Sequence, residues 1–269
     1  MKLEPFLKQA WRRYSEITPD AARIHRLLKA RGERIINDHV AFRTFNISKI
    51  DRLSLGAIFE EWGYRKSPED LDFPEKKLKA SHWIHPKREF PKVFISELLL
   101  EEFPDHLQSW VREFTAPFVS KLRIFEPEMF LGPTWHPVRF DDYQQFYPIS
   151  EYAAWTAAFG IQVNHFTVLV NELRTIPSLE ELTQLLHNGG FVLNSAGGKI
   201  KGTPAELLEQ ASTQANKIGW KFADGVSQPI MSCYYEFARR YPMPGTDKLF
   251  QGFIPKSADK IFESKFEKK

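Results

Sequence analysis

The chain has 269 residues, of which 42% are hydrophobic, and its formal net charge at pH 7 is +3. This apolar content argues against disorder, and the apolar runs are too short and too often interrupted to span a bilayer, so no membrane partner is expected. Basic and acidic residues alternate along the chain without a basic stripe, which argues against a nucleic-acid partner. The single cysteine, Cys233, excludes an internal disulfide and favours a cytoplasmic location.

An amphipathic segment, "MKLEPFLKQAWRRYSEI", opens the chain and predicts N-terminal helices over residues 1–34. Two strand-and-helix units follow. The first has the strand "NDHVAFRTFN" and a helix that ends near Gly63, and the second has the strand "VNHFTVLV" and a helix that ends near Gly189. His39 lies 24 residues before Gly63, and His165 lies 24 residues before Gly189. This equal spacing predicts that the two units are repeats.

Each unit also reaches a later apolar strand that carries one acid. These strands are "KVFISELLL" with Glu97 and "PIMSCYYEFA" with Glu236. In the second unit, "FVLNSA" predicts another strand. The segment "KGTPAELLEQAS" predicts an inserted helix that begins at Thr203, because its Thr-Pro-Ala-Glu start matches a capping box with proline at the first helical position.

Side chains two residues apart on a strand share a face. His39 and Arg43 therefore lie on one face of the first strand, and His165 lies opposite the purely apolar face of the second. That apolar face is expected to pack against a helix, so the histidine faces look into a cupped interior open to a ligand. By the same alternation, Tyr234 shares the face of Glu236.

We expect one globular unit with five parts, and no feature specifies an oligomeric state. In chain order the parts are N-terminal helices (1–34), a first module (35–130), a linker and partial lid that turns helical at 151–159 (131–160), a second module with the inserted helix (161–255), and a charged, solvated tail (256–269).

Paired units of this kind resemble the vicinal oxygen chelate superfamily. The resemblance implies an α+β fold in which two βαβββ modules form a cupped mixed sheet around a metal site, with additional helices. More narrowly, "DHVAFRTF" and "EYAAWTAAFGIQVNHFTVLVN" resemble the 2-oxoadipate dioxygenase/decarboxylase family over about residues 15–255. That resemblance implies an Fe(II) site made by His39, His165 and Glu236, with Arg43 binding a substrate carboxylate.

The implied activity is oxidative decarboxylation and hydroxylation of a 2-oxo dicarboxylic acid, 2-oxoadipate to 2-hydroxyglutarate and carbon dioxide, as in lysine catabolism. Dioxygen would be the second substrate, because two histidines and one carboxylate leave three positions on an octahedral iron. The same ligands also accept zinc, nickel, manganese or cobalt. Tyr234 is expected to donate a hydrogen bond to the substrate.

Glu97 leaves an alternative open. It either orients a ligand or makes a structural ion pair, or it is a fourth metal ligand. A four-ligand site would favour a glyoxalase-type, metal-dependent isomerase or hydrolase that needs no oxygen. A binding module without catalysis is a third hypothesis. His82 and His85 in "SHWIHP" are expected in a loop, because no acid or cysteine accompanies them at ligand spacing.

Overall fold

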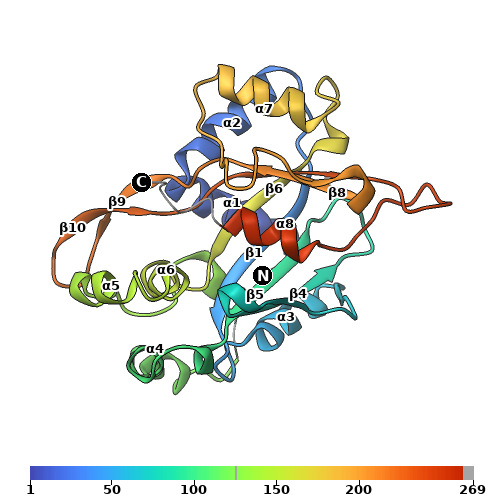
Figure 1. The fold of residues 1–269 in the computed structure, drawn as a ribbon. Coiled ribbons are helices and arrows are strands. Elements are labelled where there is room, and N and C mark those ends of the chain that lie inside the picture. Colours follow the sequence, from blue (N-terminus) through green and yellow to red (C-terminus); the bar gives the residue numbers. More distant parts are fainter. Residues whose placement is uncertain (125, 263–269) are drawn as a thin grey trace.

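The computed structural model describes residues 1–124 and 126–262 (Figure 1). The α-helices in these ranges are α1 (Leu3–Ile17), α2 (Pro19–Ala30), α3 (Arg52–Glu61), α4 (Asp105–Val119), α5 (Phe140–Phe146), α6 (Glu151–Phe159), α7 (Leu179–Asn188) and α8 (Pro255–Phe262). The strands are β1 (Asn37–Phe45), β2 (Arg65–Lys66), β3 (Leu71–Phe73), β4 (Leu78–Ile84), β5 (Lys92–Leu98), β6 (Val163–Leu169), β7 (Lys201–Thr203), β8 (Leu208–Ser212), β9 (Lys217–Lys221), β10 (Ser227–Met231) and β11 (Glu236–Arg240). None of the helices in the described ranges has the length and apolar content that a bilayer crossing requires.

One mixed sheet contains both repeats. Within the described residues its strand order is β2-β4-β5-β1-β6-β11-β8-β7, with β3 paired to β4. The central strands β1 and β6 are antiparallel to each other; β5 runs parallel to β1, and β11 runs parallel to β6. The next strands outward, β4 and β8, are antiparallel to their neighbours. The two halves therefore have the same pairing pattern, which confirms the predicted α+β fold of two paired modules.

The helices on the back of the sheet explain which strand faces are apolar. Phe42 of β1 packs against Phe59 of α3, with 5.7 Å between ring centres. In the second module, Ser178 caps α7 by accepting a hydrogen bond from the Glu181 backbone N–H, as its spacing predicted. Since Phe42 points to the back, the alternating residues His39 and Arg43 point to the front.

Two sequence predictions in the second module are wrong. The Thr-Pro-Ala-Glu start makes only a 3-10 turn, η5 (Pro204–Glu206), and strand β8 follows it, so there is no inserted helix. The expected strand "FVLNSA" is reduced to a single bridge between Leu193 and Thr213. The extra length of this module is instead a two-stranded ribbon, β9 and β10, whose Trp220 packs on Phe159 of α6.

The C-terminal segment is a further correction. It was expected to be a solvated tail, but α8 lies across the front of the sheet (Figure 1). Ser257 and Ile261 of α8 are buried, and the Asn194 side-chain amide donates to the Lys260 carbonyl at 3.0 Å. The amphipathic pattern that predicted a solvent-exposed segment therefore belongs to a helix that packs on the cup. The last part of the predicted tail, 263–269, lies outside the described residues.

Candidate metal centre and substrate pocket

The strand register brings three distant side chains together on the front of the sheet. Thr167 in β6 is paired on one side with His39 of β1 and on the other with Glu236 of β11. His165 lies two residues before Thr167 and therefore on the same face. The centre is thus built from three adjacent strands, β1, β6 and β11. Of these, β1 and β6 are the first strands of the two repeats.

The three side chains form a small triangle of possible ligand atoms. Nε2 of His165 lies 3.4 Å from Nε2 of His39 and 3.3 Å from a Glu236 oxygen, and His39 Nε2 lies 3.6 Å from the other oxygen. Ligands at right angles around a metal at about 2.1 Å are roughly 3 Å apart, so this triangle fits one face of an octahedral ion. Among the described residues, these three side chains also form the cluster of histidines and acids that could hold a metal ion.

A β-bulge precedes each histidine. The pairing of β1 with β6 slips at Asp38 and again at Asn164, so each has no partner across the ladder. Asp38 Oδ1 lies 2.8 Å from Nδ1 of His39, and Asn164 Oδ1 lies 3.1 Å from Nδ1 of His165. These oxygens can only accept, so each Nδ1 carries the proton and each Nε2 presents a lone pair. The Thr167 hydroxyl lies 3.0 Å from Nε2 of His39 and can donate to it. The two Nε2 atoms also face each other beside a carboxylate, an arrangement that suits a cation between them.

The carboxylates of the site are held by buried polar groups. Burial alone would raise the pKa of Asp38, but the charges of Arg240 and Lys92 outweigh it and hold that pKa well below its ordinary value. Burial raises the pKa of Glu236, against the opposing effects of His39 and of the Gln210 amide, which donates to Glu236 at 2.6 Å. A bound cation would reverse this shift and keep the Glu236 carboxylate charged.

Arg43 lies at the other end of the same strand face. Its Nη1 donates to Glu151 at the start of α6, at 3.1 Å, and its guanidinium lies 4.5 Å from the centre of the Tyr152 ring. Nε of Arg43 is buried, and within the described residues it has no hydrogen-bond partner. The same holds for the hydroxyl of Tyr234, whose ring stacks on His165 with 4.8 Å between ring centres. Two buried donors on the cup side are therefore available to a ligand.

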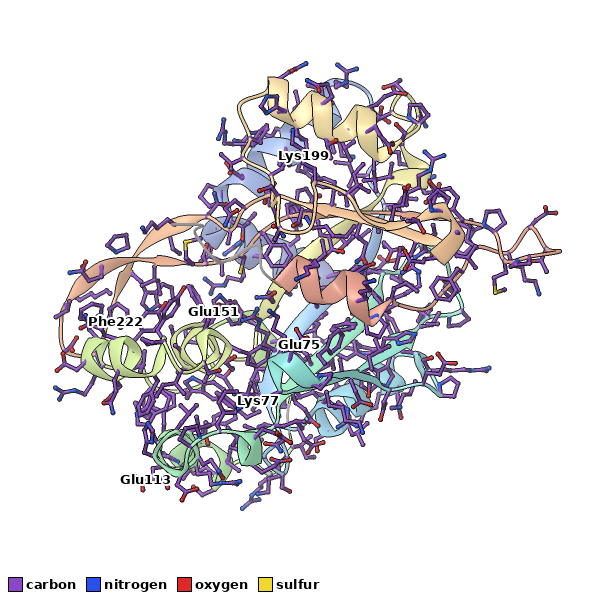
Figure 2. All side chains as sticks on the ribbon, in the orientation of Figure 1. Glu75, Lys77, Glu113, Glu151, Lys199 and Phe222 are labelled. Atoms are coloured by element: carbon purple, nitrogen blue, oxygen red, sulfur yellow. The ribbon has the colours of Figure 1, made fainter. Side chains whose placement is uncertain are left out.

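The cup has an open part and a closed part. A hollow of about 410 Å³ reaches Arg43 and Glu151, and its outer wall includes Glu75 and Lys77. Figure 2 shows Glu75, Lys77 and Glu151 beside and below α8. Beside the triangle the free space is only about 10 Å³, because side chains from the C-terminal segment, Phe253 among them, cover it.

Glu97 lies outside this arrangement. It alternates with Phe94 and Ser96 along β5 and points to the back, where it accepts hydrogen bonds from the Arg52 guanidinium and from the Arg52 backbone N–H. Arg52 also binds Asp70 at 2.9 Å. Of the alternatives for the role of Glu97, this position agrees with a structural ion pair.

One of the two histidines of "SHWIHP" differs from the expectation. His82 is not in a loop but in β4, buried against Phe253 with 5.0 Å between ring centres. Burial, with the nearby charge of Arg240, lowers its pKa to about 4. His85 follows the end of the strand, as a loop residue. His82 is thus an uncharged residue in the wall of the cup.

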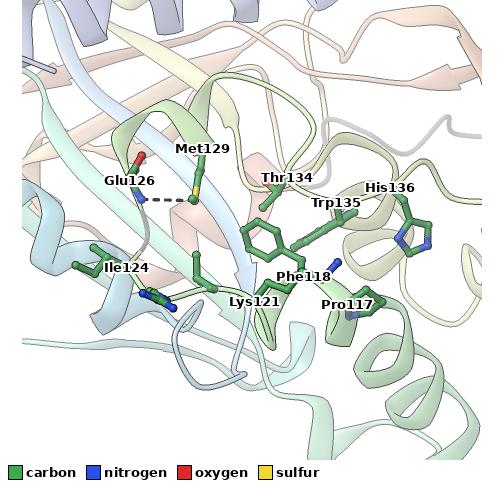
Figure 3. A pocket seen from close by; sticks show the side chains of 11 residues that line it. Pro117, Phe118, Lys121, Ile124, Glu126, Met129, Thr134, Trp135 and His136 are labelled. Atoms are coloured by element: carbon green, nitrogen blue, oxygen red, sulfur yellow. Dashed lines mark hydrogen bonds between the residues drawn. The ribbon is translucent and has the colours of Figure 1, made fainter.

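A second hollow lies elsewhere in the molecule. It has a volume of about 730 Å³ between the end of α4 and residues 126–136 (Figure 3). Trp135 and Phe118 line it together with Met129, whose sulfur accepts from the Glu126 backbone N–H at 3.5 Å. None of the three triangle residues lines this hollow. Cavity size therefore does not identify the centre in this fold, whereas the convergence of ligand atoms does.

The fold and the centre define a class of protein in which two paired strand-and-helix modules share one mixed sheet around a buried group of two histidines and a carboxylate that could hold a metal ion. The chain belongs to the 2-oxoadipate dioxygenase/decarboxylase family, a family of enzymes. The model of that family matches residues 127–250. A chloroplastic 2-oxoadipate dioxygenase/decarboxylase of Arabidopsis thaliana is 35% identical, over 87% of this chain and 69% of the relative.

Two solved structures are similar over almost the whole chain. The hydroxyglutarate synthase of Oryza sativa in complex with 2-oxoadipate is 31% identical, with a TM-score of 0.89 over 97% of this chain and 91% of that one. A protein of Shewanella frigidimarina with a provisional hydrolase name is 44% identical, with a TM-score of 0.84 over 94% and 97% of the two chains. These matches confirm the family that the sequence motifs indicated.

Sequence reasoning missed several residues of the centre. Asp38 and Asn164 could have been found, because both repeats carry an Asp or Asn directly before the histidine. Gln210 was hidden by the wrong helix prediction for its segment. Phe253 has no local signal, since its place depends on the path of the chain after β11.

Proposed function

We propose that the protein converts 2-oxoadipate and dioxygen to 2-hydroxyglutarate and carbon dioxide, with Fe(II) bound by His39, His165 and Glu236. The observation that supports this best is the buried triangle of ligand atoms on the strand face that also carries Arg43. The names of the Arabidopsis relative and of the rice complex with 2-oxoadipate agree with it. The reaction balances with one dioxygen consumed for each carbon dioxide released, so no further reductant is required.

The bound iron would supply the redox chemistry that couples dioxygen reduction to the loss of the 2-oxo acid's carboxyl carbon. The protein's part is to hold the ligands in one orientation. Asp38 and Asn164 keep the protons of the two histidines on Nδ1, and Gln210 holds one oxygen of Glu236.

Arg43 would bind the carboxylate of the substrate that lies farther from the iron. It stands four residues from His39, about 13 Å along the strand, and its long side chain can shorten that distance. Its Nη1 is held by Glu151, which leaves the buried Nε as a donor. A guanidinium edge matches a carboxylate with two parallel hydrogen bonds, so this residue would select diacids.

Tyr234 would bind the substrate near the reacting end. Its hydroxyl is buried without a partner within the described residues, and burial together with Glu236 raises its pKa well above the ordinary value. It therefore stays protonated at neutral pH and donates a hydrogen bond without accepting charge. The surrounding aromatic residues exclude water from the reacting atoms. A reducing, cytoplasmic setting, as the single cysteine favours, suits an Fe(II) enzyme.

The test is oxygen uptake by protein that is purified without oxygen and loaded with Fe(II). Adding 2-oxoadipate should consume oxygen in a one-to-one ratio with released carbon dioxide and with 2-hydroxyglutarate. Uptake without carbon dioxide, or no uptake from protein shown to contain iron, would contradict the proposal. Conversion of a substrate in the absence of oxygen would favour an isomerase or hydrolase instead.

A further inference from the structure

Arg240 in β11 connects the metal triangle to the chain segment that covers it. Its Nε and Nη2 donate to the two oxygens of Asp38 at 2.6 and 2.9 Å, and Asp38 in turn accepts from His39. Its Nη1 donates to the carbonyls of Phe250 and Gly252 at 2.9 and 2.8 Å. The side chains of Arg240 and Asp38 are 1% and 0% exposed. One buried guanidinium thus joins two parts of the site that are remote in sequence.

The segment held by Arg240 closes the site. Phe253 follows Gly252 directly, and its ring lies 4.9 Å from the ring of His39 and 5.3 Å from the Arg240 guanidinium. Ile261 of α8 lines the same small space of about 10 Å³. A space of this size holds at most about one water molecule. A 2-oxo acid therefore does not fit beside the triangle in this arrangement, and movement of the segment around Phe253 would make room for it.

Such a movement affects His39 through the shared guanidinium. If the carbonyls of residues 250 and 252 leave, Nη1 of Arg240 loses both partners while it stays buried, which is unfavourable unless the guanidinium turns. Turning it removes both guanidinium hydrogen bonds to Asp38, the group that orients His39, and leaves Lys92, 3.5 Å away, as the remaining cation beside that carboxylate. The Nδ1 partner of His165 is the neutral Asn164 rather than Asp38. The coupling through Asp38 therefore acts on His39.

We propose that Arg240 is a positioning residue that, through Asp38, fixes His39 for metal binding and at the same time fastens the segment around Phe253 over the site. Metal binding and closure of this segment then stabilise each other. This inference rests on the proposed metal site. It does not depend on which substrate the enzyme converts.

The test compares Arg240→Lys with Arg52→Lys, using Co(II) alone as the probe. Arg52 is a matched control, since it also binds two carboxylates, those of Glu97 and Asp70, but on the back of the sheet. Lysine keeps the charge in both variants and loses the fork of donors. Co(II) affinity is measured by competition with a chromophoric chelator, and hydrogen exchange is followed in peptides that cover residues 248–257.

In the wild-type protein, Co(II) should slow exchange of the amides at 250–253. Arg240→Lys should weaken Co(II) binding 10- to 100-fold, in the range found when a metal ligand loses its hydrogen-bond partner, and should abolish the effect of Co(II) on exchange. Arg52→Lys should lower stability but leave Co(II) affinity within twofold of wild type. Asp38→Asn, which keeps an oxygen for His39, should give an intermediate loss.

Three results would overturn the inference. If folded Arg240→Lys binds Co(II) as tightly as wild type, Arg240 is only structural. If Co(II) leaves the exchange of 250–253 unchanged in the wild type, metal and segment are not coupled. If the wild type binds no Co(II), the proposed metal site fails and this inference with it, so failure of the function and failure of the coupling are told apart.

Discussion

Replacing Arg43 with lysine should impair the enzyme for diacids and spare it for monoacids. Within the described part of the chain, Nε of Arg43 is buried and has no hydrogen-bond partner. Lysine has no donor at that position, so the variant loses about one charge-assisted hydrogen bond to the distal carboxylate. Such a bond contributes about 1.5–3 kcal/mol, which corresponds to roughly a 10- to 150-fold lower kcat/KM for 2-oxoadipate. The lysine ammonium can still pair with Glu151, so the fold should survive.

The assay compares 2-oxoadipate with 2-oxohexanoate, which has the same number of carbons and no distal carboxylate. For the monoacid, Arg43→Lys should change kcat/KM by less than about twofold, because the lost bond does not exist for that substrate. Thermal unfolding of both proteins verifies that the variant is folded. An equal loss on the two substrates would refute the reasoning, since Arg43 would then act on the reacting end or on the fold.

Three further predictions concern the metal, the pH and the packing. His165→Ala should lose stoichiometric Fe(II), measured by elemental analysis, while its circular dichroism remains native; retained iron with full turnover would contradict the ligand assignment. Burial lowers the pKa of His82 from 6.5 to about 4 in the folded protein. As the pH drops from about 6.5 to about 4, the unfolded chain takes up a proton on this histidine before the folded protein does. The free energy of unfolding therefore falls over this range, by at most about 3 kcal/mol. Urea unfolding at pH 7 and pH 5 should show a smaller loss in His82→Leu than in wild type, and equal losses would exclude His82 as the cause. In Gly56→Ala the new methyl group would overlap the buried indole of Trp83, so the free energy of unfolding should be about 1–3 kcal/mol lower than in wild type. In the control Gly219→Ala the new methyl group meets no atom of the described residues within 4 Å, so this change should be nearly neutral.

The repeat and its ligand residues were visible in the sequence because they depend on local patterns. Equal spacing from His39 and His165 to the helix ends reflects two copies of one strand-and-helix unit, and alternation along each strand places the histidines on the cup side. Helix α6 runs over Glu151–Phe159 as predicted, from a start capped by Ser150. These features need only neighbours within one turn or one strand.

The errors came from signals that are local but ambiguous. The start of the predicted inserted helix is satisfied by one 3-10 turn, and the residues after it gain more by pairing with β11, as Gln210 does opposite Ala238. A strand is stabilised by partners far away in sequence, so a capping pattern alone cannot exclude it. The C-terminal segment was misjudged for a related reason. A charged amphipathic stretch is equally suited to solvent and to covering a sheet.

The sequence by itself determined the family, the two repeats and the identities of His39, His165 and Glu236 as candidate ligands. Only the tertiary structure decided how these residues meet, because the register of β6 with both β1 and β11 sets the distances between their side chains. It also decided that Glu97 points to the back of the sheet and that Arg240 reaches from Asp38 to the covering segment. Contacts of this kind join strands and loops that are up to about 200 residues apart, and the free energy that selects them comes from burial and hydrogen bonding in the assembled fold rather than from any local preference.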